Sequence, residues 1–353
     1  MLKVGLVGLG HMGQLNLLNT LRIDGIAVVA GADKSEKNRK FAERYHVKTY
    51  SDYTELFETE ELDAAVISLP NFLKEECVFY AAERGVNIFL DKPIARNLSE
   101  AQAMVNKVEK ENVRMLVGAN YRYFPCVQKL KRRVDNGEIG DPLIATSELI
   151  LNGPISHALV PHPIPEWWLN KDLAGGGALL DLGYHLIDLL TWLVGDFDVA
   201  YASLESKLHL PIEDAGTVVL KGTNCDATGI VNVGWFSKTI FPEFNFRVNM
   251  HGTVGYDSTD HYIPANAKVS AVKEGVANVL RRMAGKKPNY LSYTYYYSSF
   301  YQILNEFFAA LKSGTEFPVS LDEELRVMRI IDSAYRLSEL PSENQMEIPQ
   351  IVV

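Results

Sequence analysis

The residues that most constrain the fold of this chain are three glycines near its start. Gly8, Gly10 and Gly13 follow the apolar run 2–7, which predicts a strand, and open the segment 12–21, whose leucines recur on one face of a helix. Glycine allows the tight turn between the strand and the helix, and it lets a pyrophosphate approach the backbone amides. The spacing G-x-G-x-x-G therefore predicts the first unit of a dinucleotide-binding sheet.

An acidic residue follows the second predicted strand, where such a fold binds the adenosine ribose. Asp33 lies 20 residues after Gly13, and a carboxylate there accepts both ribose hydroxyls. Its charge would repel a 2′-phosphate, which predicts NAD, although the nearby cations Lys34 and Arg39 leave NADP open. The alternative is a glycine turn followed by a helix-capping aspartate. We expect the cofactor to contact Gly8, Gly10, His11, Met12, Gly13, Asp33 and Lys34.

Short apolar runs alternate with amphipathic segments as far as residue 118. Near-continuous apolar runs are typical of parallel strands that helices cover on both faces. Residues 1–122 therefore predict an α/β domain with a doubly wound parallel sheet, the Rossmann fold. Its further strands are expected at 26–31, 47–50, 64–69, 86–90 and 114–118.

The pattern changes after Tyr123, where alternating apolar and polar residues become common. Residues 123–353 predict an α+β domain built on a large open antiparallel sheet. The basic segment 281–287 is expected to be a solvated loop. Strands are expected at 143–151, 199–207, 217–220, 228–235 and 245–251, and helices at 127–136, 178–193, 301–312 and 322–338.

Charge and cysteine content argue against several functional classes. The 353 residues carry a formal net charge of −9, so we expect no general attraction to nucleic acid or to an anionic membrane. The three cysteines lie far apart without metal-ligand spacing, which predicts no metal site and a reducing, cytoplasmic environment. No unbroken apolar run approaches about 18 residues, so no membrane span is expected.

Three side chains combine the groups needed to oxidise an alcohol. Lys92 follows a predicted parallel strand at its carboxyl end, where open α/β sheets bind ligands. Asp181 and His185 are four residues apart on a predicted helix and share one face, with Asp188 three residues further on. Beside a nicotinamide, His185 would accept the hydroxyl proton, Lys92 would stabilise the alkoxide, and Asp181 would position both. The alternatives are a surface lysine, a core histidine and an aspartate that pairs with a buried cation.

The segments that contain these residues resemble the signatures of one enzyme family. Asp91-Lys92-Pro93 is similar to the E-K-P signature of the glucose–fructose oxidoreductase/inositol dehydrogenase (Gfo/Idh/MocA) family. Residues 175–188 resemble its G-G-G-x-x-x-D-x-G-x-H-x-x-D helix, and the resemblance covers nearly the whole chain. The chain departs from the family with Asp91 in place of glutamate and with Lys74 at a position that is often histidine.

The resemblance implies an NAD(P)-dependent dehydrogenase that acts on the CH–OH group of a sugar, polyol or nucleotide sugar. It also implies a cis bond between Lys92 and Pro93. The family usually associates through the outer face of its open sheet, so a homodimer or homotetramer is expected.

Other predicted contacts rest on position and on the resemblance. Residues 120–123 resemble the N-x-R segment of the family, so Arg122 either meets a substrate or cofactor oxygen or joins the two domains. In the loop 153–170, Trp168 is predicted to bind a sugar face, and the alternative is that the tryptophans anchor the loop to the core. Further cofactor contacts are expected at Ser68, Leu69, Asn71, Asp91, Lys92 and Asn120.

Three other functions fit the same motifs. An NADPH-dependent sugar ketoreductase would run the reaction in reverse. A glycosidase or lyase would oxidise and re-reduce its substrate with tightly bound NAD, and would show no net turnover of nicotinamide. A noncatalytic sensor would bind the nucleotide without turnover, but it has no use for the proton acceptor His185.

Overall fold

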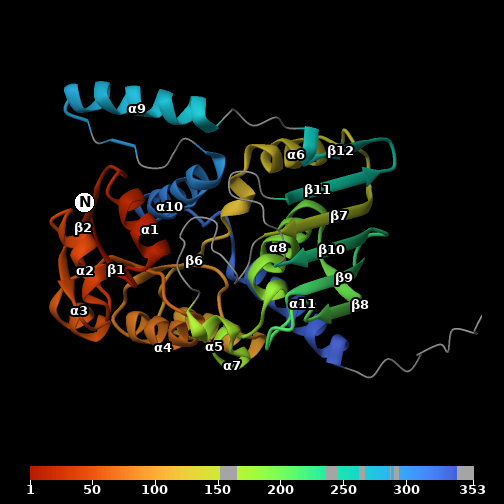
Figure 1. Ribbon diagram of the computed structural model, residues 1–353, viewed down its shortest axis with the longest axis horizontal. Helices are drawn as coiled ribbons and strands as arrows, with labels where there is room; N and C mark the ends of the chain where they lie inside the picture. The colour runs from red at the N-terminus through yellow and green to blue at the C-terminus, as the bar shows by residue number, and fades with distance from the viewer. Residues whose placement is uncertain (152–164, 236–244, 262–266, 287, 290–293, 340–353) are drawn as a thin grey trace, which may run out of the picture.

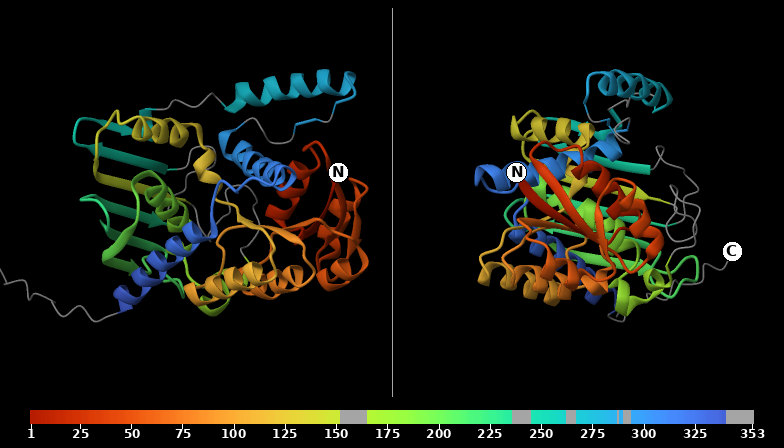
Figure 2. Two further views of the ribbon diagram at one scale, coloured as in Figure 1. Left: turned by 180° about the vertical axis from the view of Figure 1, so that it is seen from behind. Right: turned by 90° about the vertical axis from the view of Figure 1, so that its left-hand side faces the viewer.

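The computed structural model describes residues 1–151, 165–235, 245–261, 267–286, 288–289 and 294–339. Two six-stranded sheets stand side by side in this part of the chain (Figure 1). The helical layers lie between and around them, and α9 lies along one side of the molecule (Figure 2).

The first sheet is parallel throughout, as the apolar runs predict. Its strand order is β3-β2-β1-β4-β5-β6, so the winding reverses between β1 and β4. Ligands bind at the carboxyl ends of the strands beside such a reversal. The strands are β1 (Leu2–Val7), β2 (Ile26–Ala32), β3 (Lys48–Tyr50), β4 (Ala64–Ile67), β5 (Asn87–Leu90) and β6 (Met115–Val117). The helices between them are α1 (His11–Thr20), α2 (Glu36–Glu43), α3 (Tyr53–Thr59), α4 (Asn71–Ala82) and α5 (Leu98–Lys110).

The second sheet is open, with the order β12-β11-β7-β10-β9-β8. Four of its five pairings are antiparallel, as expected, and the pairing of β10 with β7 is parallel. The sheet is therefore mixed. Its strands are β7 (Pro142–Ile150), β8 (Phe197–Glu205), β9 (Ala215–Gly222), β10 (Thr228–Gly234), β11 (Asn245–Gly252) and β12 (Tyr256–Ser258). The helical segments of this half are η1 (Asn120–Tyr123), α6 (Pro125–Asp135), η3 (Glu166–Leu169), α7 (Lys171–Ala174), η4 (Leu179–Gly183), α8 (Tyr184–Val194), η5 (Thr259–His261), α9 (Ala267–Met283), α10 (Tyr295–Ser313) and α11 (Leu321–Glu339).

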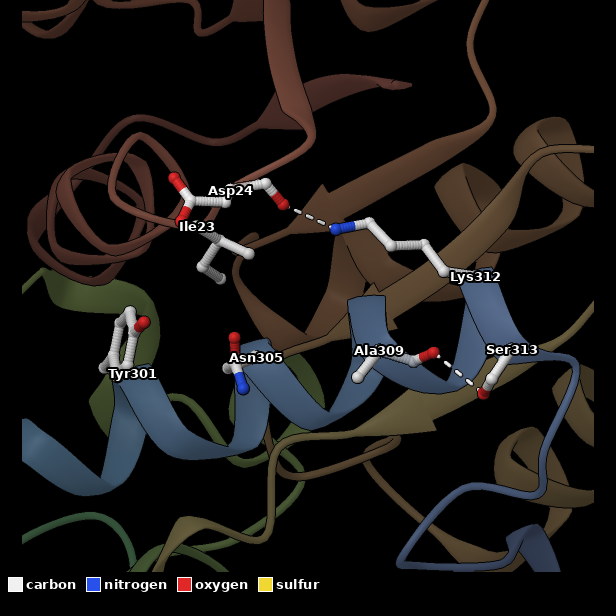
Figure 3. Close-up of a pocket in the computed structure, with 7 residues that line it drawn as sticks. All are labelled: Ile23, Asp24, Tyr301, Asn305, Ala309, Lys312 and Ser313. Atoms are coloured by element: carbon white, nitrogen blue, oxygen red, sulfur yellow. Dashed lines mark hydrogen bonds between the residues drawn. The ribbon is translucent and has the colours of Figure 1, made fainter.

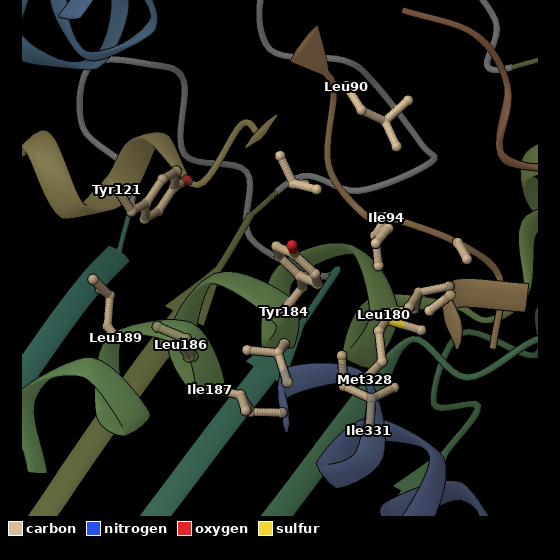
Figure 4. Close-up of a cluster of buried hydrophobic side chains, with 14 of the residues drawn as sticks. Leu90, Ile94, Tyr121, Leu180, Tyr184, Leu186, Ile187, Leu189, Met328 and Ile331 are labelled. Carbon is tan, nitrogen blue, oxygen red and sulfur yellow. The ribbon is translucent and has the colours of Figure 1, made fainter. Parts of the chain in front are cut away.

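A continuous hydrophobic core joins the two sheets. Helix α8 is buried on nearly all sides and packs against β7 and α11. Leu90 at the end of β5 and Ile94 beyond it share one buried cluster with Leu180 and Met328, and Ile94 lies near Leu180 (Figure 4). The ends of the parallel strands are thereby held against the start of α8.

Helix α10 packs with the first sheet in one buried cluster, although it lies far from that sheet in the sequence. Ile303 and Phe307 are fully buried in one cluster with Val4 and Leu6 of β1. The domain boundary between residues 122 and 123 remains a prediction.

The structure differs from the sequence-based expectations at α9. Arg281 and Arg282 lie in the last turn of α9, so the expectation of a loop from residue 281 is wrong for these residues. No helix was predicted over the residues of α9, which has Gly275 in its middle. The helical run Lys171–Val194 is long and apolar enough to cross a membrane, but 78% of its apolar window is buried, as expected for a core helix.

Candidate active site

The glycine turn has the geometry that a dinucleotide needs. Gly8 has a φ of +82°, and a Cβ there would lie 2.4 Å from the Ser68 carbonyl oxygen. A Cβ on Gly13 would lie 1.8 Å from the carbonyl oxygen of Gly8, so both positions require glycine. A Cβ on Gly10 would meet no atom within 4 Å, and no side chain caps the first turn of α1. The helix N-terminus is therefore open to a pyrophosphate.

Asp33 lies beside this turn, where the ribose prediction places it. Its Oδ2 accepts the amide of Leu9 at 2.7 Å, and its Oδ1 accepts the amide of Ser35 at 2.7 Å. The guanidinium of Arg39 donates to the carbonyl oxygens of Asp33 at 2.7 Å and of Lys34 at 3.0 Å. A fixed negative charge and a nearby positive charge thus flank the ribose position.

The ends of β4 and β5 are connected through a buried asparagine that no local sequence pattern indicates. Asn16 of α1 donates from Nδ2 to Ser68 Oγ at 3.1 Å and to Asp91 Oδ1 at 3.0 Å. Burial raises the pKa of Asp91, and the bonds to Ser68 and Asn16 oppose this rise. Asn71 donates to the Ala174 carbonyl oxygen at 2.8 Å, so its side chain connects α4 to α7. The predicted contacts of Ser68 and Asp91 with the cofactor are compatible with this arrangement.

Lys74 supports the peptide that carries Lys92. Its buried ammonium donates to the carbonyl oxygens of Asp91 at 2.8 Å and of Pro93 at 2.7 Å. The Lys92–Pro93 bond is cis, as the resemblance implies. Burial lowers the pKa of Lys74 to about 7, and Asp91 opposes this shift. Lys74 therefore fixes both sides of the residue predicted to meet the substrate oxygen.

Lys92 and Asp181 form a half-buried ion pair. Lys92 Nζ donates to Asp181 Oδ1 at 2.8 Å and to the Asp181 carbonyl oxygen at 2.9 Å. An ammonium has three donors, so one N–H remains for a ligand. Trp235 Nε1 donates to Asp181 Oδ2 at 3.3 Å, and Trp168 stacks on Trp235 with the ring centroids 6.1 Å apart. Trp168 is thus placed close to the predicted catalytic aspartate.

The glycine triplet before α8 is fixed by close packing. Cβ atoms at Gly176 and Gly177 would each lie 2.0 Å from an oxygen, of Tyr335 and Glu213 respectively. The Glu213 carboxylate accepts the amides of Gly177 at 2.7 Å and of Leu179 at 3.2 Å. Residues Leu179–Gly183 then form a π-helical turn, where an α-helix was expected. Such turns are frequent at functional sites, and this one holds Asp181.

His185 lies at the start of α8, and the residue is only 5% exposed. The ring stacks on Tyr121, with the centroids 3.9 Å apart and the planes at 12°. Within the described part of the chain, no hydrogen bond is found for its ring nitrogens. Burial, and then the charge of Lys92, lower its pKa well below the usual value. The imidazole is therefore neutral at pH 7 and able to accept a proton.

Arg122 is buried, and its guanidinium is occupied by protein carboxylates. It donates to Asp188 Oδ1 from Nη2 at 2.6 Å and to Glu323 Oε1 from Nη1 at 2.9 Å. These bonds favour the alternative in which Arg122 joins η1 to α8 and α11. Asn120 donates to Ser299 Oγ at 2.8 Å, and its Oδ1 is buried without a partner among the described residues.

Other predicted features lie elsewhere or outside the described residues. Residues 153–164 of the tryptophan-containing loop are not described. No group of three metal-ligating side chains occurs in the described ranges, so the absence of a metal stays a prediction. A hollow of about 390 Å³ between α10 and the loop after α1 contains none of the predicted site residues (Figure 3).

Comparison with known families agrees with this geometry. The model described as "Oxidoreductase family, NAD-binding Rossmann fold" matches residues 2–119, and the GFO/IDH/MocA C-terminal domain matches residues 127–256. The chain belongs to the Gfo/Idh/MocA family. It is therefore an NAD-binding oxidoreductase, and the open turn at Gly10 together with Asp33 fits that cofactor.

Several relatives match this chain along nearly its full length. The uncharacterized oxidoreductase YrbE of Bacillus subtilis is 26% identical over 94% of this chain and 92% of its own. Myo-inositol 2-dehydrogenase of Thermotoga maritima is 24% identical over 99% of this chain and 100% of its own. The WlbA dehydrogenase of Bordetella pertussis, solved with NADH and UDP-GlcNAcA, has a TM-score of 0.78 at 20% identity, covering 96% of this chain and 95% of that chain.

Proposed function

We propose that the protein is an NAD-dependent dehydrogenase that oxidises a secondary alcohol of a sugar, polyol or nucleotide sugar. The observation that carries the proposal is the buried, neutral imidazole of His185 near an ammonium that Asp181 holds in place. A proton acceptor and a positive charge are the two groups that alcohol oxidation requires of the protein.

His185 accepts the hydroxyl proton of the substrate in this mechanism. Its ring needs no prior deprotonation at neutral pH, because burial already favours the uncharged form. The third N–H of Lys92 binds the same substrate oxygen and stabilises the negative charge that develops there. Asp181 fixes the direction of that N–H by accepting the other two.

Bound NAD supplies the hydride acceptor. The amides at the start of α1 would hold its pyrophosphate, and Asp33 would hold the adenosine ribose. The carboxyl ends of β4 and β5 carry Ser68 and Asp91, on the side where ligands of such sheets bind.

The substrate class rests on the relatives and on the indole ring of Trp168. The T. maritima relative is named for myo-inositol, a cyclic polyol, and the B. pertussis dehydrogenase was solved with the nucleotide sugar UDP-GlcNAcA. Trp168 is half-buried and stacks on the buried Trp235, which bonds to Asp181, so the Trp168 indole lies near the predicted site, and an indole face suits the C–H face of a sugar ring. We also infer a homodimer or homotetramer, because the outer side of the second sheet exposes Ile144 and Tyr201. The free cysteines Cys77, Cys126 and Cys225 support the inference of a cytoplasmic location.

The test is the formation of reduced nicotinamide, followed by its absorbance, with NAD or NADP and a panel of polyols, free sugars and nucleotide sugars. Substrate-dependent reduction that is lost in His185→Ala supports the proposal. A matched control, Gln102→Ala, removes an exposed side chain of α5 that bonds only to Asn106 and is expected to retain most activity. Normal kcat/KM in both His185→Ala and Lys92→Ala would show that the catalytic assignment is wrong. If no panel member reacts, NAD released on denaturation of the protein would point to a cofactor recycled within each turnover.

A further inference from the structure

Helix α9 exposes a continuous apolar stripe to solvent. Val272, Val276, Val279 and Met283 follow each other at spacings of four and three residues, which places them on one side of a helix. Their exposed fractions are 68%, 58%, 59% and 80%. Val269 and Leu280 extend the same stripe and are also exposed.

The opposite, polar side of α9 faces the rest of its own chain. Asn278 donates from Nδ2 to the Asn289 carbonyl oxygen at 2.8 Å and accepts the Asn289 amide at 2.7 Å. Asn289 Oδ1 in turn accepts Arg22 Nη2 at 3.2 Å. At about 100° per residue, Asn278 lies nearly opposite the stripe. The half-buried residues of α9 share its side: Ser270, Ala271, Glu274, Asn278 and Arg281.

This orientation is the reverse of that of an ordinary surface helix, which turns its apolar side toward the core. Figures 1 and 2 show α9 at the edge of the molecule, alongside α10 and α1. A contiguous exposed apolar surface is a liability for a monomer unless another surface covers it.

The net charge of α9 indicates which kind of surface covers its apolar stripe. Four basic residues and one glutamate give α9 a net charge of +3, whereas the whole chain carries −9, so the remainder of the chain carries −12. A second copy of the chain therefore offers α9 a strongly acidic body. Two α9 helices are poorly suited to pair with each other, because Lys268, Lys273 and Arg282 stand on both flanks of the stripe and would repel their counterparts.

We propose that α9 is an intersubunit arm, whose apolar stripe docks on the body of a second copy of this chain. Helices that lie on lipid typically use tryptophan, phenylalanine and leucine, whereas this stripe consists mainly of valine, which favours a protein partner. A helix of 17 residues is about 25 Å long and covers far less than the ~800 Å² per partner of a stable interface. The arm therefore adds to a larger contact between folded subunits.

The test compares the oligomeric state of two matched triple variants by sedimentation over a range of concentrations. Val272→Ser, Val276→Ser and Val279→Ser together remove the stripe without changing the charge. Gly275→Ser, Ala277→Ser and Ala284→Ser place the same hydroxyls at exposed positions outside the stripe. We expect the stripe variant to raise the dissociation constant of the assembly at least tenfold, and the control variant to leave it within twofold.

Two results would overturn the proposal. One is a wild-type protein that stays monomeric at all concentrations, and the other is a stripe variant that assembles as the wild type does. Binding to vesicles that contain anionic lipid tests the other candidate partner, a lipid surface. If the wild type is monomeric and binds them while the stripe variant does not, the stripe serves a lipid surface and the intersubunit arm is excluded.

Discussion

The phenol ring of Tyr121 lies flat against the imidazole of His185, with the ring centroids 3.9 Å apart. Tyr121 comes from η1, at the end of the parallel sheet, whereas His185 begins α8. This contact fixes the plane of the predicted base, and it excludes water from one face of the imidazole. Burial, which lowers the pKa of His185, depends in part on this neighbour.

Replacement of Tyr121 by leucine is expected to shift the pH dependence of catalysis. A more hydrated imidazole has a higher pKa, and only its neutral form accepts a proton, so the acid limb of kcat/KM should move to higher pH. We expect kcat at pH 7 to fall about tenfold, because the ring also loses its orientation. The measurement is the pH profile of both parameters.

Tyr121→Phe is the matched control, since it keeps the aromatic face and removes only the hydroxyl. Its acid limb should stay close to that of the wild type. An unshifted limb in Tyr121→Leu, in a protein that still folds, would show that the stacking does not control the titration of His185.

The ion pair between Lys92 and Asp181 leads to a second prediction. Asp181→Asn keeps the shape of the side chain but weakens its hold on the ammonium, so kcat should fall about 10- to 100-fold with little change in KM. Trp235→Phe removes the indole bond to Asp181 Oδ2, keeps an aromatic ring beside Trp168, and should have a smaller effect. The measurement is steady-state kinetics on the substrate found with the panel. Equal losses in both variants would contradict the assigned role of the carboxylate.

Much of the site could be predicted because its signals are local. The turn from Gly8 to Gly13 needs glycine for steric reasons that act within one strand and one helix. Lys92 and His185 stand in motifs short enough to be read directly from the sequence. The residues that hold them in place were missed, because Asn16 and Glu213 act on partners 75 and 36 residues away. An isolated polar residue on a helix gives no indication of such a partner.

The fold shows the same division between local and distant signals. The period of apolar residues predicted the parallel strands, and the predicted helices at 301–312 and 322–338 lie within α10 and α11. The packing of α10 on the first sheet depends on distant contacts such as that of Phe307 with Phe89 of β5, whose ring centroids are 5.6 Å apart, and no local period reveals them. Helix α9 was missed because its apolar side faces away from the core and Gly275 interrupts its helical propensity.

Asp33 provides the test of cofactor preference. Asp33→Asn keeps an oxygen that can accept the Leu9 amide, and it removes the charge that would repel a 2′-phosphate. We expect the ratio of kcat/KM for NAD to that for NADP to fall at least tenfold, mainly through KM for NAD. Arg39 remains beside the site and should help NADP to bind. An unchanged ratio would exclude Asp33 as the determinant of preference, and Lys37→Asn on the exposed side of α2 serves as the control.

Glu324 of α11 is a buried carboxyl group that links stability to pH. Tyr184 donates to its Oε2, while its Oε1 has no partner among the described residues. Burial raises the pKa of Glu324 from 4.5 to about 8, and the charge of Arg122 opposes this rise. Between pH 4.5 and about pH 8, the folded protein therefore keeps a proton on Glu324 that the unfolded chain releases. The stability that this group contributes is complete below the lower value and is lost as the pH rises through the upper one.

Glu324→Gln should remove that loss, because an amide stays neutral and can still accept the bond from Tyr184. Relative to the wild type, the free energy of unfolding of the variant should increase by about 1 kcal/mol for each pH unit between pH 5 and pH 8. Urea denaturation at several pH values measures this difference. Glu316→Gln, on an exposed side chain, controls for the loss of a surface charge. A difference between Glu324→Gln and the wild type that stays constant with pH would mean that Glu324 is ionised in the folded protein, and that Arg122 outweighs its burial.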